Sequence, residues 1–213
     1  MSKHVWYAIT SFGDASLGLP CALLVAFVLL VPATTRRLAF VWLAIVVAGE
    51  TIVAATKVMY MGWHLGIPSL DFIGLSGHTT LSFMVWPVTF ALVLGRTDRW
   101  RAIGAAVGIV FALLIAFSRL KIHVHSLSEV VLGAFLGITL SSFFLLRYRR
   151  RLDPVALPRW LFLIFILPFV FGYGRVAPTE SILAAVARTL SGHSHVYTRA
   201  DLHTAVHERP GAP

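Results

Sequence analysis

The sequence predicts an all-α membrane protein, a polytopic helical bundle with about six transmembrane helices. Hydrophobic residues make up 58% of the chain and charged residues only 13%, a balance outside the range of ordinary soluble domains. The apolar residues are gathered into long runs separated by short polar loops. Each run is close to the ~20 residues with which a helix crosses a bilayer. These observations predict a single membrane-embedded domain.

The apolar runs predict membrane spans, in chain order, over 17–33, 38–56, 78–95, 101–118, 128–146 and 158–174. The first run ends at Ala33 like a signal peptide with a small-residue cleavage site. Because Arg36 and Arg37 follow at once and the leader is long, we interpret this run as an uncleaved span. The aromatic residues within 1–16 predict an interfacial segment ahead of the first span.

Basic residues between the spans predict the orientation of the bundle. Ten arginines fall on alternate loops and therefore on one side of the membrane: Arg36, Arg37, Arg96, Arg99, Arg101, Arg147, Arg149, Arg150, Arg151 and Arg159. By the positive-inside rule that side is cytoplasmic, so both termini and the loops 57–77 and 119–127 face outward. The formal charge of +9 then reflects topology, and we expect no nucleic-acid partner. We expect a multi-pass cell (inner) membrane protein in which 175–213 form a polar extracytoplasmic tail.

Two short motifs lie at outward-facing ends of the predicted spans. Leu-Ser-Gly-His over 75–78 precedes the third span, and Ser-Arg over 118–119 ends the fourth, with His125 and Glu129 following it. Lys57 lies on the same side, at the exit of the second span. Ionisable residues at a membrane boundary are functional candidates. We therefore expect three loops that are far apart in the sequence to converge on one site.

Several of these residue types suit the binding of an oxyanion. Ser76 is placed to cap the third span, and the unpaired amides from Gly77 onward favour an anion above the helix start. Arg119 adds a planar fork that matches phosphate oxygens, and Lys57 adds a compact positive charge. Such a clamp stabilises the charge that spreads over the equatorial oxygens during phosphoryl transfer.

The remaining residues supply a nucleophile and a proton donor. His125 and Glu129 stand four positions apart and share a helix face if the fifth span begins a turn early. A carboxylate there holds one ring nitrogen protonated and leaves the other as a nucleophile. His78 is then available as the general acid for the leaving oxygen. The pattern predicts a phosphate-handling active site that uses no metal ion or cofactor, because cations and amides supply the charge.

On these motifs the chain resembles the type 2 phosphatidic acid phosphatase (PAP2) superfamily of integral membrane lipid phosphatases. That family has Pro-Ser-Gly-His where this chain has 75–78, and Ser-Arg with a later histidine and aspartate where this chain has its second motif. The resemblance implies a PAP2-like transmembrane phosphatase domain over 1–174, with its site on the extracytoplasmic (periplasmic) face. It implies catalytic roles for His125, His78 and Glu129. It also implies phosphate binding by Lys57, Ser76, Gly77, Ser118, Arg119 and His64.

The chain departs from the family pattern in three places. Leu75 replaces the proline before the serine. Glu129 replaces the aspartate and would orient the histidine from one methylene further away. After six intervening residues Lys57 is followed by His64 and Leu65, where the family has Arg-Pro. A neutral imidazole at His64 supplies less charge than a guanidinium, which affects substrate charge more than reaction type.

Other polar residues keep more than one interpretation. Ser118 either contacts phosphate or satisfies a helix carbonyl. Glu50, two turns before Lys57, is either an internal polar partner or a functional group. A second Ser-Gly-His over 191–193 lies in the polar tail with no span after it, and we expect no catalytic role for it. The tail histidines indicate either metal binding or a solvated segment: His193, His195, His203 and His207.

The predicted function is hydrolysis of a phosphate mono- or pyrophosphate ester of a lipid through a phosphohistidine intermediate. Candidate substrates are polyprenyl pyrophosphate, phosphatidate, phosphatidylglycerol phosphate and phosphorylated lipid A. A lipid phosphotransferase that uses the same phosphohistidine is the alternative. A non-enzymatic anion transporter would need a broken helix at the midplane or paired half-repeats, and the sequence has neither. The sequence leaves the oligomeric state open.

Overall fold

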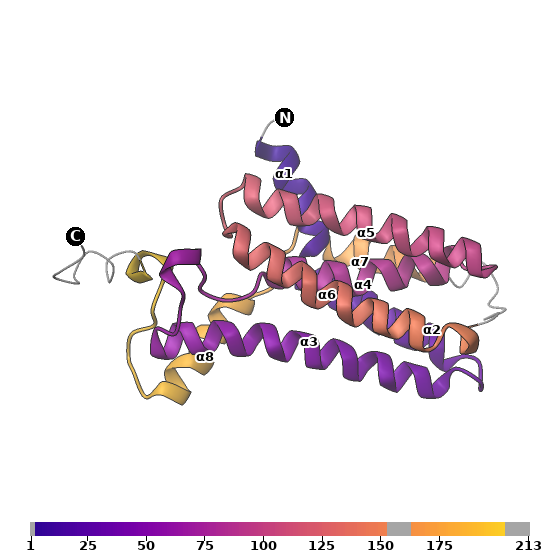
Figure 1. The fold of residues 1–213 in the computed structure, drawn as a ribbon, viewed down its shortest axis with the longest axis horizontal. Helices are drawn as coiled ribbons and strands as arrows, with labels where there is room; N and C mark the ends of the chain where they lie inside the picture. The colour runs from indigo at the N-terminus through magenta and orange to yellow at the C-terminus, as the bar shows by residue number, and fades with distance from the viewer. Residues whose placement is uncertain (1–2, 153–162, 203–213) are drawn as a thin grey trace.

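The computed structural model describes residues 3–152 and 163–202 and consists in these ranges of helices joined by loops, which confirms the predicted all-α class (Figure 1). An isolated bridge between Ile67 and Phe72 is the one β-type pairing in them. The elements, in chain order, are α1 Lys3–Thr10, η1 Ser11–Gly13, α2 Ala15–Leu30, α3 Arg36–Trp63, η2 Pro68–Leu70, α4 Gly77–Leu94, α5 Asp98–Lys121, α6 Leu127–Arg147, η3 Arg149–Arg151, α7 Ile166–Gly172 and α8 Thr179–Ser191.

Five helical stretches of the described ranges are long and apolar enough to cross a membrane, so the chain is a multi-pass membrane protein. They are Lys3–Leu30, Arg36–Trp63, Gly77–Leu94, Asp98–Lys121 and Leu127–Arg147. The first of these joins the predicted interfacial segment to the first span. Of the sixth predicted span, 158–174, the part 158–162 lies outside the described residues. The rest contains only a short apolar helix, Leu163–Gly172.

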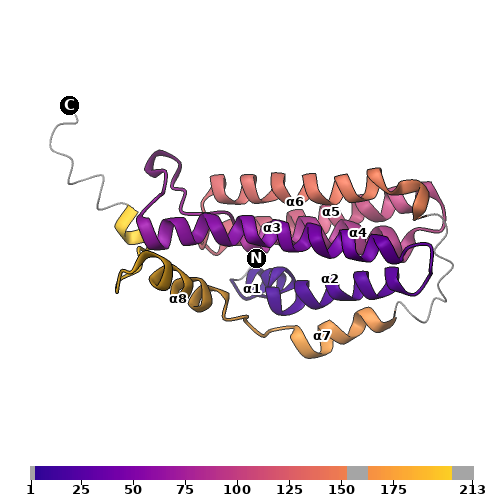
Figure 2. The ribbon, with the colours of Figure 1, turned by 90° about the horizontal axis from the view of Figure 1, so that it is seen from below.

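The central helix of the bundle is α4, whose residues are buried on nearly every face. It packs closely against α5 and α6 because glycines bring the backbones together. A Cβ built on Gly108 of α5 would lie 2.5 Å from Pro87 Cα, and one on Gly137 of α6 would lie 2.5 Å from Thr80 O. Figure 2 shows α3 beside this core, with α2 and then α7 on the side away from α6.

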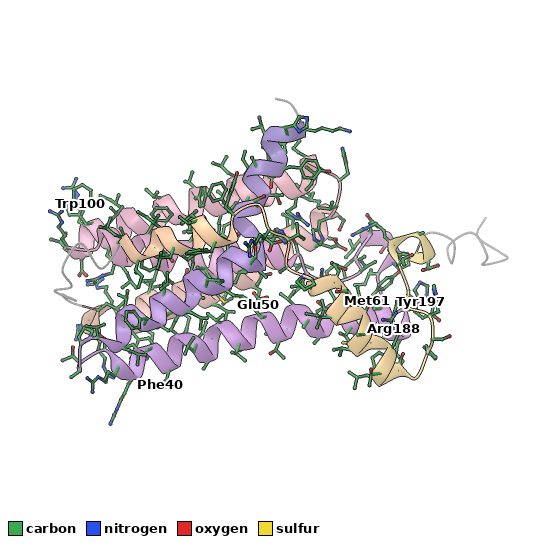
Figure 3. All side chains as sticks on the ribbon, turned by 180° about the vertical axis from the view of Figure 1, so that it is seen from behind. Phe40, Glu50, Met61, Trp100, Arg188 and Tyr197 are labelled. Carbon is green, nitrogen blue, oxygen red and sulfur yellow. The ribbon has the colours of Figure 1, made fainter. Side chains whose placement is uncertain are left out.

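The chain reverses direction so that its polar loops divide between the two ends of the bundle. The α2–α3 and α4–α5 turns and the end of α6 lie together at one end, and the α3–α4 and α5–α6 connections lie at the other (Figure 1). Phe40 and Trp100 mark the first end, while Arg188 and Tyr197 mark the second (Figure 3). The arginine-rich loops therefore share one end, as the alternation of charges predicts.

Two helices run further toward the second end than the apolar runs predict. α3 ends at Trp63 rather than near 56, and α5 ends at Lys121 rather than near 118. The extra turns of α3 are held by tertiary contacts, because Tyr60 is buried and its hydroxyl donates to Thr198 O at 2.6 Å. Lys57 and Arg119 consequently lie on helices and not on loops.

Candidate active site

A cavity of about 630 Å³ lies at the second end of the bundle. Five of the predicted site residues line it: Lys57, Gly77, His78, Arg119 and His125. They come from α3, α4, α5 and the α5–α6 turn. The structure therefore brings these segments together at one place, as predicted.

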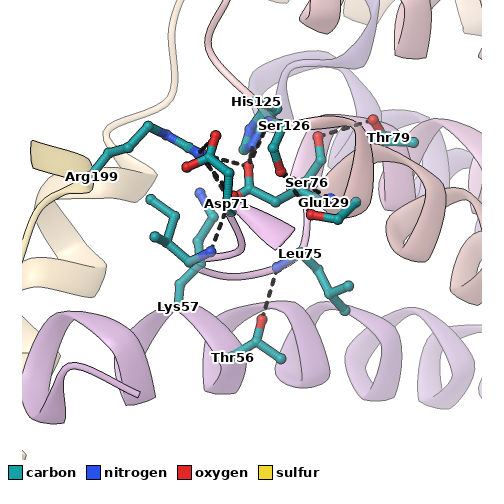
Figure 4. Close-up of polar contacts among 12 residues, drawn as sticks. Thr56, Lys57, Asp71, Leu75, Ser76, Thr79, His125, Ser126, Glu129 and Arg199 are labelled. Carbon is teal, nitrogen blue, oxygen red and sulfur yellow. Dashed lines mark hydrogen bonds and ion pairs between the residues drawn. The ribbon is translucent and has the colours of Figure 1, made fainter. Parts of the chain in front are cut away.

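His125 is held by Glu129 from the first turn of α6. The two side chains meet at 2.6 Å between Nδ1 and Oε2, with Glu129 fully buried (Figure 4). A carboxylate only accepts, so Nδ1 carries the proton and Nε2 keeps its lone pair. Ser126 begins α6 with a capping box in which Glu129 is the partner, so the helix start itself fixes the carboxylate. This arrangement leaves Nε2 as the unprotonated nitrogen of the imidazole.

The surroundings of His125 favour its neutral form. Burial lowers the pKa of the imidazole, the hydrogen bond with Glu129 acts in the opposite direction, and the Arg119 charge adds to the lowering. The net direction is downward. A neutral ring at neutral pH has the free lone pair that nucleophilic attack requires.

Arg199, far along the chain, is a partner of Glu129 that the sequence did not reveal. Its Nη2 donates to Oε1 at 2.8 Å and to Oε2 at 2.7 Å (Figure 4). Its Nη1 donates to Asp71 O at 3.0 Å and pairs with Asp71 Oδ2 at 2.7 Å. The Ile73 amide adds a further bond to Glu129 Oε1 at 3.0 Å. A buried carboxylate needs such compensation, and Glu129 has it from both a guanidinium and backbone amides.

His78 and Arg119 meet partners from the N-terminal segment. Nε2 of His78 lies 3.5 Å from Asp14 Oδ2, and Nη1 of Arg119 donates to Thr10 Oγ1 at 2.9 Å. Nε of Arg119 has no hydrogen-bond partner in the described part of the chain, although it is buried. The guanidinium thus lines the cavity wall with one N–H group that has no hydrogen-bond partner in the described residues.

Lys57 pairs with a carboxylate of the C-terminal helix. Its Nζ lies 2.6 Å from Oε1 of Glu180 on α8. Burial alone would raise the pKa of Glu180, but the ammonium outweighs it and lowers that pKa. The loop before α4 packs on the same lysine, because Gly74, at φ 140°, leaves room where a Cβ would lie 2.8 Å from Lys57 Cγ. Lys57 is therefore positioned from two sides.

Three predicted phosphate-binding residues are not among those that line the cavity. Ser76 is fully buried at the N-cap of α4, but its side chain makes no cap bond and accepts instead from Thr79 Oγ1 at 2.9 Å. The predicted capping interaction was wrong for this reason. Ser118 is fully buried and donates to Ile115 O at 2.6 Å, which is the helix-carbonyl alternative. His64 ends α3 in the left-handed conformation and stacks on Tyr197, with ring centroids 4.5 Å apart.

The C-terminal segment folds over the site. Residues of 174–183 form one wall of the cavity, so the predicted boundary at 174 falls within that wall. His193 Nδ1 lies 3.0 Å from Gly62 O, and the second Ser-Gly-His stays outside the cavity lining. His195 faces Asp201 at 3.8 Å, while His203 and His207 lie outside the described residues.

Comparison with known proteins gave two matches. A sequence model of the PAP2 superfamily matches residues 68–153. An "Uncharacterized 22.5 kDa protein in cps region" of Klebsiella pneumoniae is 36% identical over 203 residues, which cover 93% of this chain and 97% of the relative. No solved structure matches the chain significantly. The matched range 68–153 contains both motifs, whereas Asp14, Glu180 and Arg199 lie outside it.

Proposed function

Because the chain belongs to the PAP2 superfamily, a membership that indicates phosphatase activity on phosphate esters, we propose that it hydrolyses a phosphate mono- or pyrophosphate ester of a lipid. The observation that carries this proposal is the cavity in which His125, His78, Arg119 and Lys57 meet at one end of a membrane bundle. Two imidazoles and two cations around one space fit a phosphoryl group and its leaving oxygen.

In the proposed reaction Nε2 of His125 attacks phosphorus while the bond from phosphorus to the leaving oxygen breaks. His78 gives its proton to that oxygen, which departs as an alcohol or as a lipid phosphate. Water then attacks the phosphohistidine, His78 takes the proton, and the bond between phosphorus and Nε2 breaks to release phosphate. Arg119, Lys57 and the amides that begin α4 stabilise the charge on the equatorial oxygens, so the chemistry does not require a metal ion.

A lipid substrate is supported by the mixed lining of the cavity. Next to the charged groups the walls carry apolar side chains from α3, α4 and α8, namely Val53, Leu81, Ile182 and Leu183. Such walls suit an acyl or prenyl chain, while the polar end holds the phosphate. Candidates remain polyprenyl pyrophosphate, phosphatidate, phosphatidylglycerol phosphate and phosphorylated lipid A. With the arginine-rich end cytoplasmic, the site would face the periplasmic side of the inner membrane.

The test is phosphate release from a panel of these four lipids by the purified protein in detergent or nanodiscs. We expect turnover of at least one lipid, persistence in excess chelator, and inhibition by vanadate, which mimics five-coordinate phosphorus. An absolute requirement for an added alcohol or sugar would indicate the phosphotransferase instead. If the folded protein released no phosphate from any of these lipids, the proposal would be refuted.

The rate should depend on pH through the nucleophile. Neutral His125 attacks, and the pKa of this imidazole is lowered by burial. The acidic limb of the pH–rate profile should therefore lie below the ordinary histidine pKa of about 6.5. A pH–rate profile of kcat/KM on the best lipid measures this limb. A loss of activity on acidification that begins while the pH is still above about 6.5 would contradict a neutral, desolvated nucleophile.

Removal of the Glu180 charge should improve substrate binding. Phosphate must compete with this carboxylate for Lys57, since the two side chains are 2.6 Å apart. For Glu180→Gln we expect a KM about 2-fold to 5-fold lower, in keeping with the strength of a partly exposed ion pair, at similar kcat. Ser181→Ala is the matched control, because its hydroxyl only donates to Pro178 O. A raised KM in Glu180→Gln would mean that the carboxylate supports binding.

A further inference from the structure

The N-terminal segment places a buried carboxylate beside the proposed proton donor. Asp14 lies at the break between η1 and α2, and only 6% of its side chain is exposed. It faces His78, with 3.5 Å between Oδ2 and Nε2. A carboxylate so far from solvent has to be compensated by donors or by a positive charge.

Asp14 uses its two oxygens for different partners. Oδ1 accepts from the Ser16 amide at 2.8 Å, which caps α2, and from the Ala177 amide at 3.0 Å, which ties down the C-terminal segment. Oδ2 is left for the imidazole. The backbone amides thereby fix the carboxylate in place, and the oxygen that meets His78 is not required for the helix cap.

We propose that Asp14 is a positioning residue for His78, holding its ring through Nε2 and favouring its protonated form, so that Nδ1 is presented to the leaving oxygen. The inference rests on the proposed function and assigns that site a second carboxylate–imidazole pair beside Glu129 and His125. The two pairs have opposite tasks. Glu129 orients a ring that must keep a lone pair, and Asp14 supports a ring that must bring a proton.

The other charges around His78 make such a partner necessary. Arg119 from α5 lines the same cavity as His78 and its charge acts against a positive ring, whereas Asp14 faces His78 with the opposite charge. Without Asp14, the charge of Arg119 would favour the neutral form of His78, which lacks the proton that the leaving oxygen needs. A negative charge within about 4–6 Å favours the protonated form.

Asp14→Asn separates this role from a structural one. Asparagine caps helices as well as aspartate does, and its carbonyl oxygen can still accept from Ser16 and Ala177. The substitution therefore removes the charge and keeps the fold. We expect kcat to fall about 10-fold to 100-fold with KM within about 2-fold, and the basic limb of the pH–rate profile to move to lower pH. Asp98→Asn, at the opposite end of the bundle, should change neither.

A double-mutant cycle gives the decisive kinetic result. If Asp14 acts through His78, adding Asp14→Asn to His78→Ala should cost nothing further, because the group it serves is gone. Independent losses that multiply would overturn the proposal and leave Asp14 a structural cap. This cycle presupposes a wild-type protein that releases phosphate.

A spectroscopic titration tests the pair without turnover. In protein with isotope-labelled histidine, the His78 resonance is assigned by its loss in His78→Ala. The pH midpoint of this resonance should drop by about 1 unit or more in Asp14→Asn and stay unchanged in Asp98→Asn. An unmoved His78 midpoint would refute the pairing even if the protein proved to act on no lipid phosphate. A moved midpoint in an inactive protein would instead retain the pair and reject the proposed function.

Discussion

His125→Ala is expected to lower phosphate release by roughly 10³-fold or more, because it removes the group that forms the bond to phosphorus. His125 lines the cavity, and its Nδ1 is already held by Glu129 at 2.6 Å. The measurement is kcat on the best lipid of the panel. Rapid quench with substrate labelled in its phosphate should trap an acid-labile phosphoenzyme in the wild type and none in the variant.

Two further variants define the nucleophile. His123→Asn is the control: His123 lies two positions away at φ 57°, a conformation that asparagine tolerates, and does not line the cavity. It should keep full activity. Glu129→Gln should retain more activity than His125→Ala, because it keeps a hydrogen-bonding group while losing the charge. Full turnover in His125→Ala would refute His125 as the nucleophile. Loss of activity in His123→Asn alone would assign that role to His123.

Arg119→Ala should produce the second large effect, a fall in kcat/KM of about 10²-fold to 10³-fold. The guanidinium lines the cavity, is anchored to Thr10 by Nη1 at 2.9 Å and keeps a buried Nε without a hydrogen-bond partner in the described residues. Substrate phosphate would meet the guanidinium where it lines the cavity. Because the effect concerns charge that develops during the reaction, kcat should fall more than KM rises.

Arg119→Lys distinguishes charge from geometry. Lysine restores the positive charge but not the planar fork, so we expect recovery of only part of the lost rate. Lys121→Ala is the matched control, since this exposed cation of the same helix end contacts the Phe117 ring at 5.0 Å and does not line the cavity. An Arg119→Ala enzyme with nearly wild-type kcat/KM would exclude the guanidinium from the clamp.

The bundle and the centre of the site were predictable because their signals are local. Apolar runs of bilayer length identify helices wherever the chain lies, and charge alternation assigns their ends. His125 and Glu129 meet because they are close in sequence and the capping box at Ser126 holds the Glu129 carboxylate at the helix start, next to the residue before the cap. The local pattern was misleading at Ser76, because its hydroxyl accepts a hydrogen bond from the nearby Thr79 instead of bonding to the helix amides.

The rest of the site could not be predicted because its contacts are long-range. Arg199 meets Glu129 across 70 positions, and Glu180 meets Lys57 across 123. Nothing in a polar segment after the last apolar run indicates where it will fold back. Asp14 carried the one available signal, a lone acid at the edge of an apolar run, but that signal names no partner.

The pairing of Arg199 with Glu129 also bears on the order in which the site is completed during synthesis. The chain emerges from its N-terminus, and the arginine follows the carboxylate by 70 residues. At about 5–20 residues per second, translation of that interval takes roughly 4 to 14 s. During this time α6 is completed behind α1 to α5 and both histidines have been made, while the buried carboxylate beside His125 still lacks its guanidinium. The finished geometry around His125 is thus acquired only after the bundle that carries it has been made.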